Sequence, residues 1–215
     1  MKERPIIFNG EMVRAILEGR KTMTRRPNEM PIRDQEWQPV GCPYGQPGDR
    51  LWVRETFNWS GDNELLPGEP YKKCPERAGY TSDNVVWAAD GYGEHPQYGK
   101  ALWRPSIHMP RWASRITLEI VSVRVERVQD IAKGTQAEVI HRIENEGVTC
   151  KSYTGAPYCT NCSGHEAPCH IEKFQRTWNS ANAKNGYGWD ANPWVWVIEF
   201  RAAQAQGGEG DKRRH

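Results

Sequence analysis

A cluster of basic and hydroxyl side chains follows a glycine near the start of the chain. The run Lys21-Thr22-Met23-Thr24-Arg25-Arg26 begins two residues after Gly19. Like charges this close repel one another, and such clusters are usually kept for an anionic or polar ligand. The alternative is a solvated basic turn, because runs of charge are common on protein surfaces. The residues that we take as candidate ligand-binding residues are Arg20, Lys21, Thr24, Arg25 and Arg26.

A helix and a strand must position this cluster. The apolar spacing of residues 10–18 predicts an amphipathic helix, with Asn9 as its N-cap and Gly19 as its stop. A strand would then place Lys21, Met23 and Arg25 on one face, and Thr22, Thr24 and Arg26 on the other. Lys21 and Thr24 therefore converge only if the corner is bent or bulged, as the start of a strand often is.

The spacing Gly19-x-Lys21-x-x-Thr24-x-Arg26 resembles the signature of the ASCH domain, whose general form is G-x-K-x-x-E-x-R. Thr24 stands where the general form has Glu, and bacterial N4-acetylcytidine amidohydrolases also have Thr there. Residues 47–55, 103–110 and 186–200 are similar to ASCH-like proteins of tailed phages and prophages. The resemblance implies an α+β, mainly β, PUA-like barrel with flanking helices and long loop insertions, and it implies that a phage encodes the protein.

The resemblance also implies residues for an amidohydrolase reaction. In that family a Lys and a Thr of the motif act with a Glu on a later helix, and Lys21 and Thr24 match the first two. A desolvated lysine beside arginines has a lowered pKa, so Lys21 would accept a proton from Thr24 or from water. Alignment of the later helix puts Ile140 at the Glu position. After a shift, Glu138, Glu144 or Glu146 would serve, and we take Glu144 as the candidate.

A second basic and aromatic segment spans residues 103–115. Its two prolines exclude a helix interior and predict an extended loop. Arginine with interleaved tryptophan can stack on bases while contacting phosphates, although a packed loop that caps the barrel is an equal alternative. The candidates here are Arg104, His108, Arg111 and Trp112. Glu55 follows the inward face of an expected strand, so it either pairs with an arginine or belongs to the pocket.

Cysteine and histidine residues cluster late in the chain, in the order Cys150, Cys159, Cys162, His165, Cys169 and His170. A C-x2-C pair with further Cys and His nearby is typical of a tetrahedral zinc site. The intervening residues are too polar to fold by apolar burial, so a structural zinc would explain how they are ordered. The alternative is a disordered loop with thiols.

The remaining patterns predict one domain over residues 1–203. We expect it to carry an inserted loop at 58–100, a Cys/His-rich insertion at 148–172 and a disordered tail at 204–215. Apolar spacing predicts two later helices, at residues 135–146 and 174–181. Alternation and apolar runs predict strands at residues 5–8, 50–57, 85–89, 115–127 and 194–200.

Composition limits the function classes. The formal net charge is only +2, so any nucleic-acid contact must be local. An apolar signal core and a run of about 18 apolar residues are both missing from the sequence, which predicts a cytoplasmic protein without a membrane span. We expect binding of RNA or a modified nucleotide, which PUA-like barrels commonly perform. The alternatives are an amidohydrolase on N4-acetylcytidine or a related modified base, and a phage accessory protein that binds a host protein.

Overall fold

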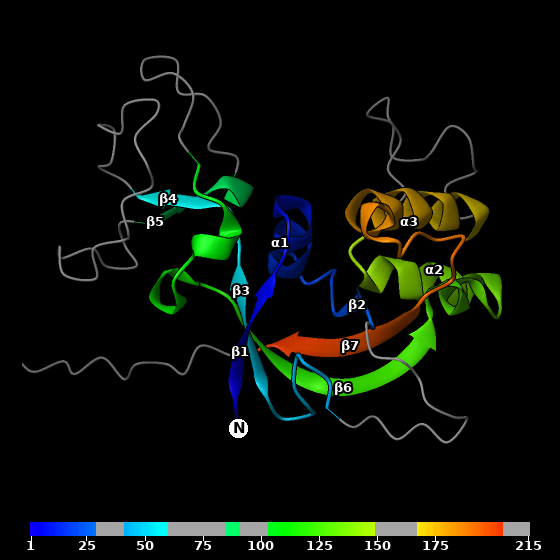
Figure 1. The fold of residues 1–215 in the computed structure, drawn as a ribbon, viewed down its shortest axis with the longest axis horizontal. Helices are drawn as coiled ribbons and strands as arrows, with labels where there is room; N and C mark the ends of the chain where they lie inside the picture. The colour runs from blue at the N-terminus through cyan, green and yellow to red at the C-terminus, as the bar shows by residue number, and fades with distance from the viewer. Residues whose placement is uncertain (29–40, 60–84, 91–102, 149–166, 204–215) are drawn as a thin grey trace, which may run out of the picture.

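The computed structural model describes residues 1–28, 41–59, 85–90, 103–148 and 167–203. A mixed five-stranded sheet runs through the molecule (Figure 1). Its strands, in spatial order, are β1 (Glu3–Ile7), β3 (Arg50–Arg54), β6 (Thr117–Arg127), β7 (Trp194–Ala202) and β2 (Met23–Pro27). The β1–β3 pair is parallel and the other three pairs are antiparallel. The chain therefore has an α+β architecture, with its longest pairing between β6 and β7.

Helices lie along the sheet, and a small second sheet stands beside it. The second sheet pairs β4 (Phe57–Trp59) with β5 (Val85–Trp87). The helices are α1 (Gly10–Leu17), α2 (Gln136–Asn145) and α3 (Ala167–Asn182). Figure 1 shows α1 between the small sheet on one side and the α2–α3 pair on the other. Short 3-10 turns complete the described chain at Ala88–Asp90, Ser106–His108, Arg111–Ala113, Val128–Ala132 and Ala183–Asn185.

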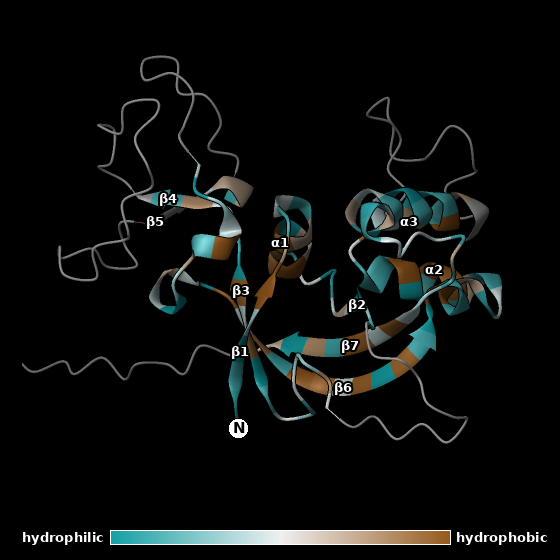
Figure 2. Ribbon diagram, viewed as in Figure 1, coloured by the Kyte–Doolittle hydropathy of each residue, from teal (hydrophilic) through white to brown (hydrophobic). Residues whose placement is uncertain are grey.

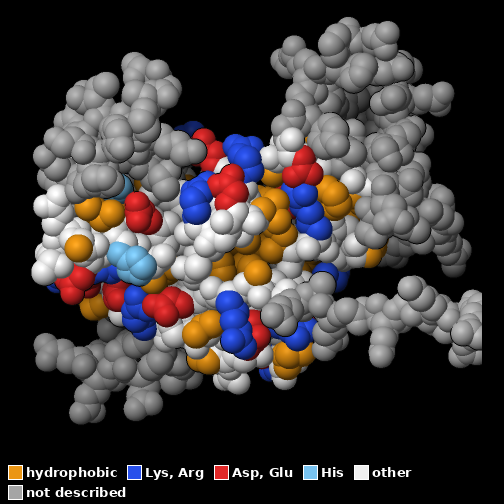
Figure 3. Space-filling model, turned by 180° about the vertical axis from the view of Figure 1, so that it is seen from behind, with side chains coloured by type: hydrophobic (Ala, Val, Ile, Leu, Met, Phe, Trp, Pro, Cys, Tyr) orange, Lys and Arg blue, Asp and Glu red, His pale blue; other side chains and the backbone are white. Residues whose placement is uncertain are grey.

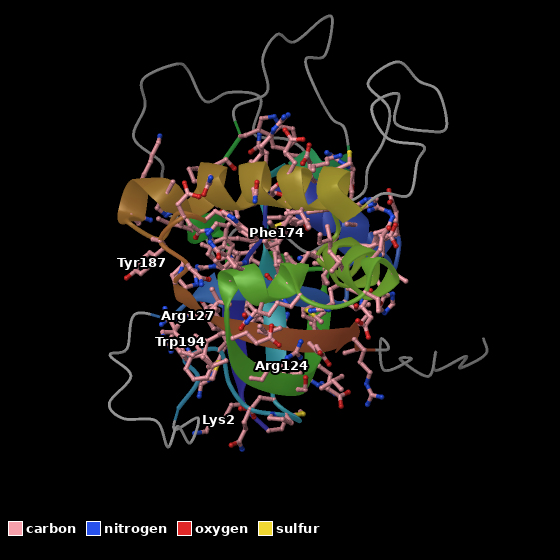
Figure 4. All side chains as sticks on the ribbon, turned by 90° about the vertical axis from the view of Figure 1, so that its right-hand side faces the viewer. Lys2, Arg124, Arg127, Phe174, Tyr187 and Trp194 are labelled. Carbon is pink, nitrogen blue, oxygen red and sulfur yellow. The ribbon has the colours of Figure 1, made fainter. Side chains whose placement is uncertain are left out.

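Strand β7 is buried on both faces, and each face contributes to a different apolar cluster. Trp196, Ile198 and Phe200 pack with α1, β1 and β3, whereas Val195 and Val197 pack beneath α2 and α3. This explains the unbroken apolar run of β7, because alternate side chains of a strand point to opposite faces. Figure 2 shows apolar stretches on both β6 and β7. Figure 4 shows Phe174 at the contact between α3 and the layer below it.

The helix ends follow local signals in the sequence. Asn9 accepts a hydrogen bond from the Met12 amide and so caps α1. Thr135 and Glu138 form a reciprocal capping box at the start of α2. Trp178 fixes the far end of α3, because its indole N–H donates to the Tyr187 carbonyl at 2.7 Å.

The described sheet does not close into the barrel that the sequence analysis predicts. Strands β1 and β2 are the two edges of the described sheet, and no backbone pairing in the described residues joins them. The Arg26 side chain bridges these edges, since its guanidinium donates to the Ile7 carbonyl at 2.5 Å and lies 5.1 Å from the Phe8 ring centroid. The described sheet is therefore open, and the Arg26 side chain reaches across the gap.

Two element predictions need correction. Residues 103–115 are not simply extended, because 3-10 turns begin directly after Pro105 and Pro110. Proline lacks only a donor that the first turn of a helix does not use, so it is compatible with a helix start. Helix α3 begins at Ala167, inside the expected insertion at 148–172, rather than at Phe174. Across the described ranges, no helix combines the length and apolarity that crossing a membrane requires.

Candidate ligand site at the end of α1

The basic cluster lies where α1 turns into β2. The helix ends with Glu18 as its C-cap, and Gly19 takes a positive φ of 72°. The amides of Arg20 and Lys21 both donate to the Ala15 carbonyl at 2.9 Å, which folds the chain back on the helix end. Gly19 thus stops the helix as the sequence predicts, because glycine adopts this conformation without steric penalty.

Lys21 is buried, with 2% of the residue exposed. Its ammonium Nζ donates to the Met23 carbonyl at 2.6 Å, to the Glu146 carbonyl at 2.7 Å and to Glu146 Oε2 at 3.2 Å. The Phe8 ring centroid lies 5.7 Å from the same atom. Burial lowers the pKa of Lys21, and the negative charge of Glu146 partly opposes that shift.

Glu146 is the carboxylate that meets the motif. It caps the C-terminus of α2 and forms an isolated antiparallel β-bridge with Lys21. Its second oxygen, Oε1, accepts from Arg25 at 2.7 Å. Gly147, with φ of 80°, permits this approach, since a Cβ there would stand 2.9 Å from the Ala15 Cβ and 3.2 Å from the Lys21 Cβ.

Alternating charges continue from Glu146 across the sheet. Arg25 also contacts Glu126 at 3.1 Å, Glu126 accepts from Arg124 at 2.5 Å, and Arg124 pairs with Glu199. Every cation in this row therefore has a carboxylate beside it, and the row as a whole is electrically balanced. Arg25 is consequently engaged within the protein and is not displayed as an open cationic patch.

The other motif residues lie on different sides of β2. Thr24 is buried and pairs in register with Ile198, so its side chain faces the cluster that contains α1. Arg25 shares the opposite face with Val197. Arg20 is partly exposed and forms an ion pair with Glu18. The structure brings Lys21 and Arg25 together, as alternation predicts, and places Thr24 on the other face of the strand.

Glu144, our sequence-based candidate, lies apart from Lys21. Its side chain is 49% exposed, and Oε1 is 3.9 Å from His170 Nε2 on α3. Ile140, the aligned position, packs on the cluster beneath α2 and α3. Glu146 is one of the three alternatives that the sequence offers. Gly147 is the signal in its favour, because a glycine directly after a helix marks the C-terminal turn, and this turn packs against Ala15 and Lys21.

The second basic segment lies on the far side of α1 from α2 and α3, beside β4 and β5 (Figure 1). Arg104 is buried and pairs through its backbone with Phe57. Glu55 is buried and accepts two hydrogen bonds from Arg115, at 3.0 and 3.1 Å, so of our two alternatives the structure has the ion pair. His108 is exposed, and Trp112 packs on the small cluster around Phe57. Arg111 binds Glu3 and lies above Trp52.

The cysteine and histidine candidates are only partly described. Cys150, Cys159, Cys162 and His165 lie outside the described residues. Cys169 and His170 belong to the start of α3, where His170 is buried and Cys169 is half-buried. In the described part of the chain, no three Cys, His, Asp or Glu side chains come together as a metal site.

A groove borders the polar centre between α1 and α3. Its lining includes Arg14, Glu18, Arg20, Glu146, Gly147 and Lys173. Figure 3, which views the molecule from behind, shows basic and acidic side chains close together around an apolar area on this face. We call this hollow the α1–α3 groove. The groove offers a ligand both signs of charge and the backbone of the Glu146–Gly147 turn.

Comparisons with known proteins identify no family. No family model matches the sequence, and no curated protein matches it. Among solved structures, the crystal structure of protein EF3133 from Enterococcus faecalis V583, described as DUF984, matches with a TM-score of 0.40 and 7% sequence identity. The match covers 94% of this chain and 81% of that chain.

Proposed function

We propose that this chain is a PUA-like protein of the ASCH type that binds RNA or a modified nucleotide beside the Lys21 centre. The observation that carries the proposal is the position of Glu146, which contacts the buried Lys21 on one side and lines the α1–α3 groove. The Arg26 bridge between β1 and β2 supports the barrel-like part of the proposal, because it holds the sheet edges together.

The lining of the groove suits a nucleotide better than a purely apolar ligand. Arg14, Arg20 and Lys173 supply cationic groups on its walls, and Glu18 supplies an acceptor. A nucleotide carries an anionic phosphate together with a base that both donates and accepts hydrogen bonds. Arginine and lysine recognise the phosphate, and peptide groups can bind the base.

Calorimetric titration with cytidine, N4-acetylcytidine and cytidine monophosphate tests this proposal. We expect Lys173→Ala and Arg20→Ala to weaken binding of the monophosphate about 10- to 150-fold, the effect of losing one charge-assisted hydrogen bond. Lys133→Ala is the matched control, because this lysine is 77% exposed on the turn before α2, away from the groove lining. Equal affinity in all variants, or no binding by the folded protein, would contradict the proposal.

A second candidate function is hydrolysis of an N4-acyl cytosine, and the 3.2 Å contact between Lys21 Nζ and Glu146 Oε2 favours it. In this proposal Lys21, once it has lost a proton, removes a proton from an attacking water, and Thr24 takes no part because it lies on the other face of β2. The acyl carbon gains the hydroxyl oxygen and the bond from that carbon to N4 breaks. The proton that Lys21 removed then passes through the Glu146 carboxylate to the departing amine. The lowered pKa of Lys21 suits a proton acceptor.

Incubation with N4-acetylcytidine, followed by chromatographic detection of cytidine, tests the second candidate. We expect Lys21→Met and Glu146→Gln each to lower turnover at least 100-fold, the usual contribution of general acid–base catalysis. Glu144→Gln is the matched control, because this glutamate is two residues away and more exposed. No turnover by the folded wild type rejects hydrolysis, and a loss confined to Glu144→Gln would reassign the carboxylate.

We also propose a structural zinc ion held by four of the six late Cys and His residues. Cys169 and His170 stand in the first turns of α3, next to the segment that supplies the other four candidates. A shell of cysteine and histidine leaves no open position for water, so the ion would order the chain rather than take part in chemistry.

A further inference from the structure

We propose that the outer face of the β1–β3–β6 sheet binds a single strand of nucleic acid, with one base stacked on Trp52. We call this surface the Trp52 face. It is formed by Arg50, Trp52 and Arg54 of β3 together with their neighbours in register. The inference rests on the proposed function for the class of ligand, and it extends that function from a nucleotide to a strand.

The alternation of β3 separates the Trp52 face from the core. Leu51 and Val53 are 0% and 1% exposed, whereas Arg50, Trp52 and Arg54 are half-buried on the other side. Side chains that are paired in register share a face of the sheet. The register therefore adds Glu3, Pro5 and Ile7 from β1, and Thr117 and Glu119 from β6.

Two arginines lie over the Trp52 ring. The Arg54 guanidinium carbon lies 5.0 Å from the Trp52 ring centroid, and that of Arg111 lies 5.9 Å from it. Hydrogen bonds hold both arginines in place, from Arg54 to the Met109 carbonyl at 3.1 Å and from Arg111 to Thr117 at 3.2 Å. In the complex that we propose, the more exposed Arg111 turns from the ring toward a phosphate, and a base stacks on the ring in its place.

The charge of this face favours a polyanion. Four arginines stand on it, Arg50, Arg54, Arg111 and Arg201, against the two carboxylates of Glu3 and Glu119. Arg201 is 69% exposed and pairs with Glu119 at 2.8 Å. The net charge of the whole chain is only +2, so a nucleic-acid site must be a local excess of positive charge. The arginines of the Trp52 face provide such an excess.

The Trp52 face also differs from the Lys21 centre in the burial and ion pairing of its cations. At Lys21 the charges are buried and form a balanced row with carboxylates. On the Trp52 face two of the four arginines are open to solvent, with Arg111 43% exposed and Arg201 69% exposed. Exposed arginines can exchange a surface carboxylate for a phosphate at little cost, because surface ion pairs contribute only about 0–1 kcal/mol. The two sites are thus independent in structure.

Fluorescence anisotropy with a short, labelled, mixed-sequence single-stranded RNA tests the inference. We expect Trp52→Leu to weaken binding about tenfold, which is the effect of losing one stacked base. We expect Arg201→Gln to reduce the slope of log Kd against log salt by about one, because one phosphate contact is lost. Arg201 is the second test position, since its exposed side chain contributes little to folding.

Matched controls exist for both variants. Trp194→Leu removes a half-buried tryptophan that Arg127 covers at 4.1 Å, and Arg176→Gln removes an exposed arginine paired with one glutamate on α3. Both should bind RNA like the wild type. Figure 4 shows Arg127 and Trp194 side by side.

The outcomes separate this inference from the proposed function. Weaker RNA binding in Trp52→Leu with unchanged nucleotide binding supports the Trp52 face. RNA binding that is lost in Lys21→Met but kept in Trp52→Leu overturns the inference and leaves the proposed function standing. Equal loss in test and control variants, absence of RNA binding by the folded protein, or binding of a partner protein in its place also overturns it.

Discussion

Lys21 and Arg25 share one buried carboxylate, and this arrangement makes the stability of the fold depend on pH. Burial lowers the pKa of Lys21 in the folded protein below its ordinary value of 10.5. Between those two pKa values the unfolded chain binds more protons at residue 21 than the folded chain does. The contribution of Lys21 to the free energy of unfolding therefore rises as the pH increases through this window.

Urea unfolding of the wild type and of Lys21→Met, at neutral and at alkaline pH, measures this effect. The difference in free energy of unfolding, wild type minus variant, should shift in favour of the wild type as the pH rises. Lys184→Met, at an exposed site after α3, controls for the loss of a lysine as such. A difference that stays constant with pH would show that Lys21 keeps its ordinary protonation in the folded state.

At the scale of elements, strong periodicity identified most of the fold. The helix at α1, the long strand at β6 and the buried strand at β7 all follow from apolar spacing and from the cap at Asn9. The start of α3 was missed because Pro168, Cys169 and His170 suggested a metal loop, although proline is compatible with the first turn of a helix. The contact between Lys21 and Glu146 could not be read from spacing, since it depends on how the end of α2 docks onto the α1 corner.

The proposed zinc site, which includes candidates at the start of α3, can be tested by metal analysis. Purified protein should contain stoichiometric zinc by mass spectrometry, and a chelator should lower the melting temperature, because metal binding to a folded site is folding free energy. Cys159→Ser and Cys162→Ser should lose the metal, while Cys42→Ser should keep it, since Cys42 packs against the cluster beside α1. A metal-free protein with an unchanged melting temperature would refute the site.

At the scale of the whole molecule, the two basic segments that the sequence offers as ligand-binding candidates lie in separate places. Lys21 and Arg25 meet Glu146 beneath α2, whereas Arg104 and Trp112 lie around β4 and β5. Composition shows that arginine and tryptophan are interleaved, but it carries no information about which side of α1 each segment occupies. The consequence for function that we propose is two separate binding surfaces, the α1–α3 groove between helices and the Trp52 face on the sheet.

Because β7 is buried on both faces, the sheet and both apolar clusters can be completed only after β7 has been synthesised. Strand β2, at residues 23–27, has its only neighbour in the described sheet in β7, at residues 195–199. Both apolar clusters draw side chains from that same late strand. During synthesis the ribosome releases β7 after every other described strand, so earlier segments wait with their sheet edges unpaired. Contacts between such distant parts of a chain slow folding and prolong exposure to aggregation, which makes this protein a candidate client of chaperones during its synthesis.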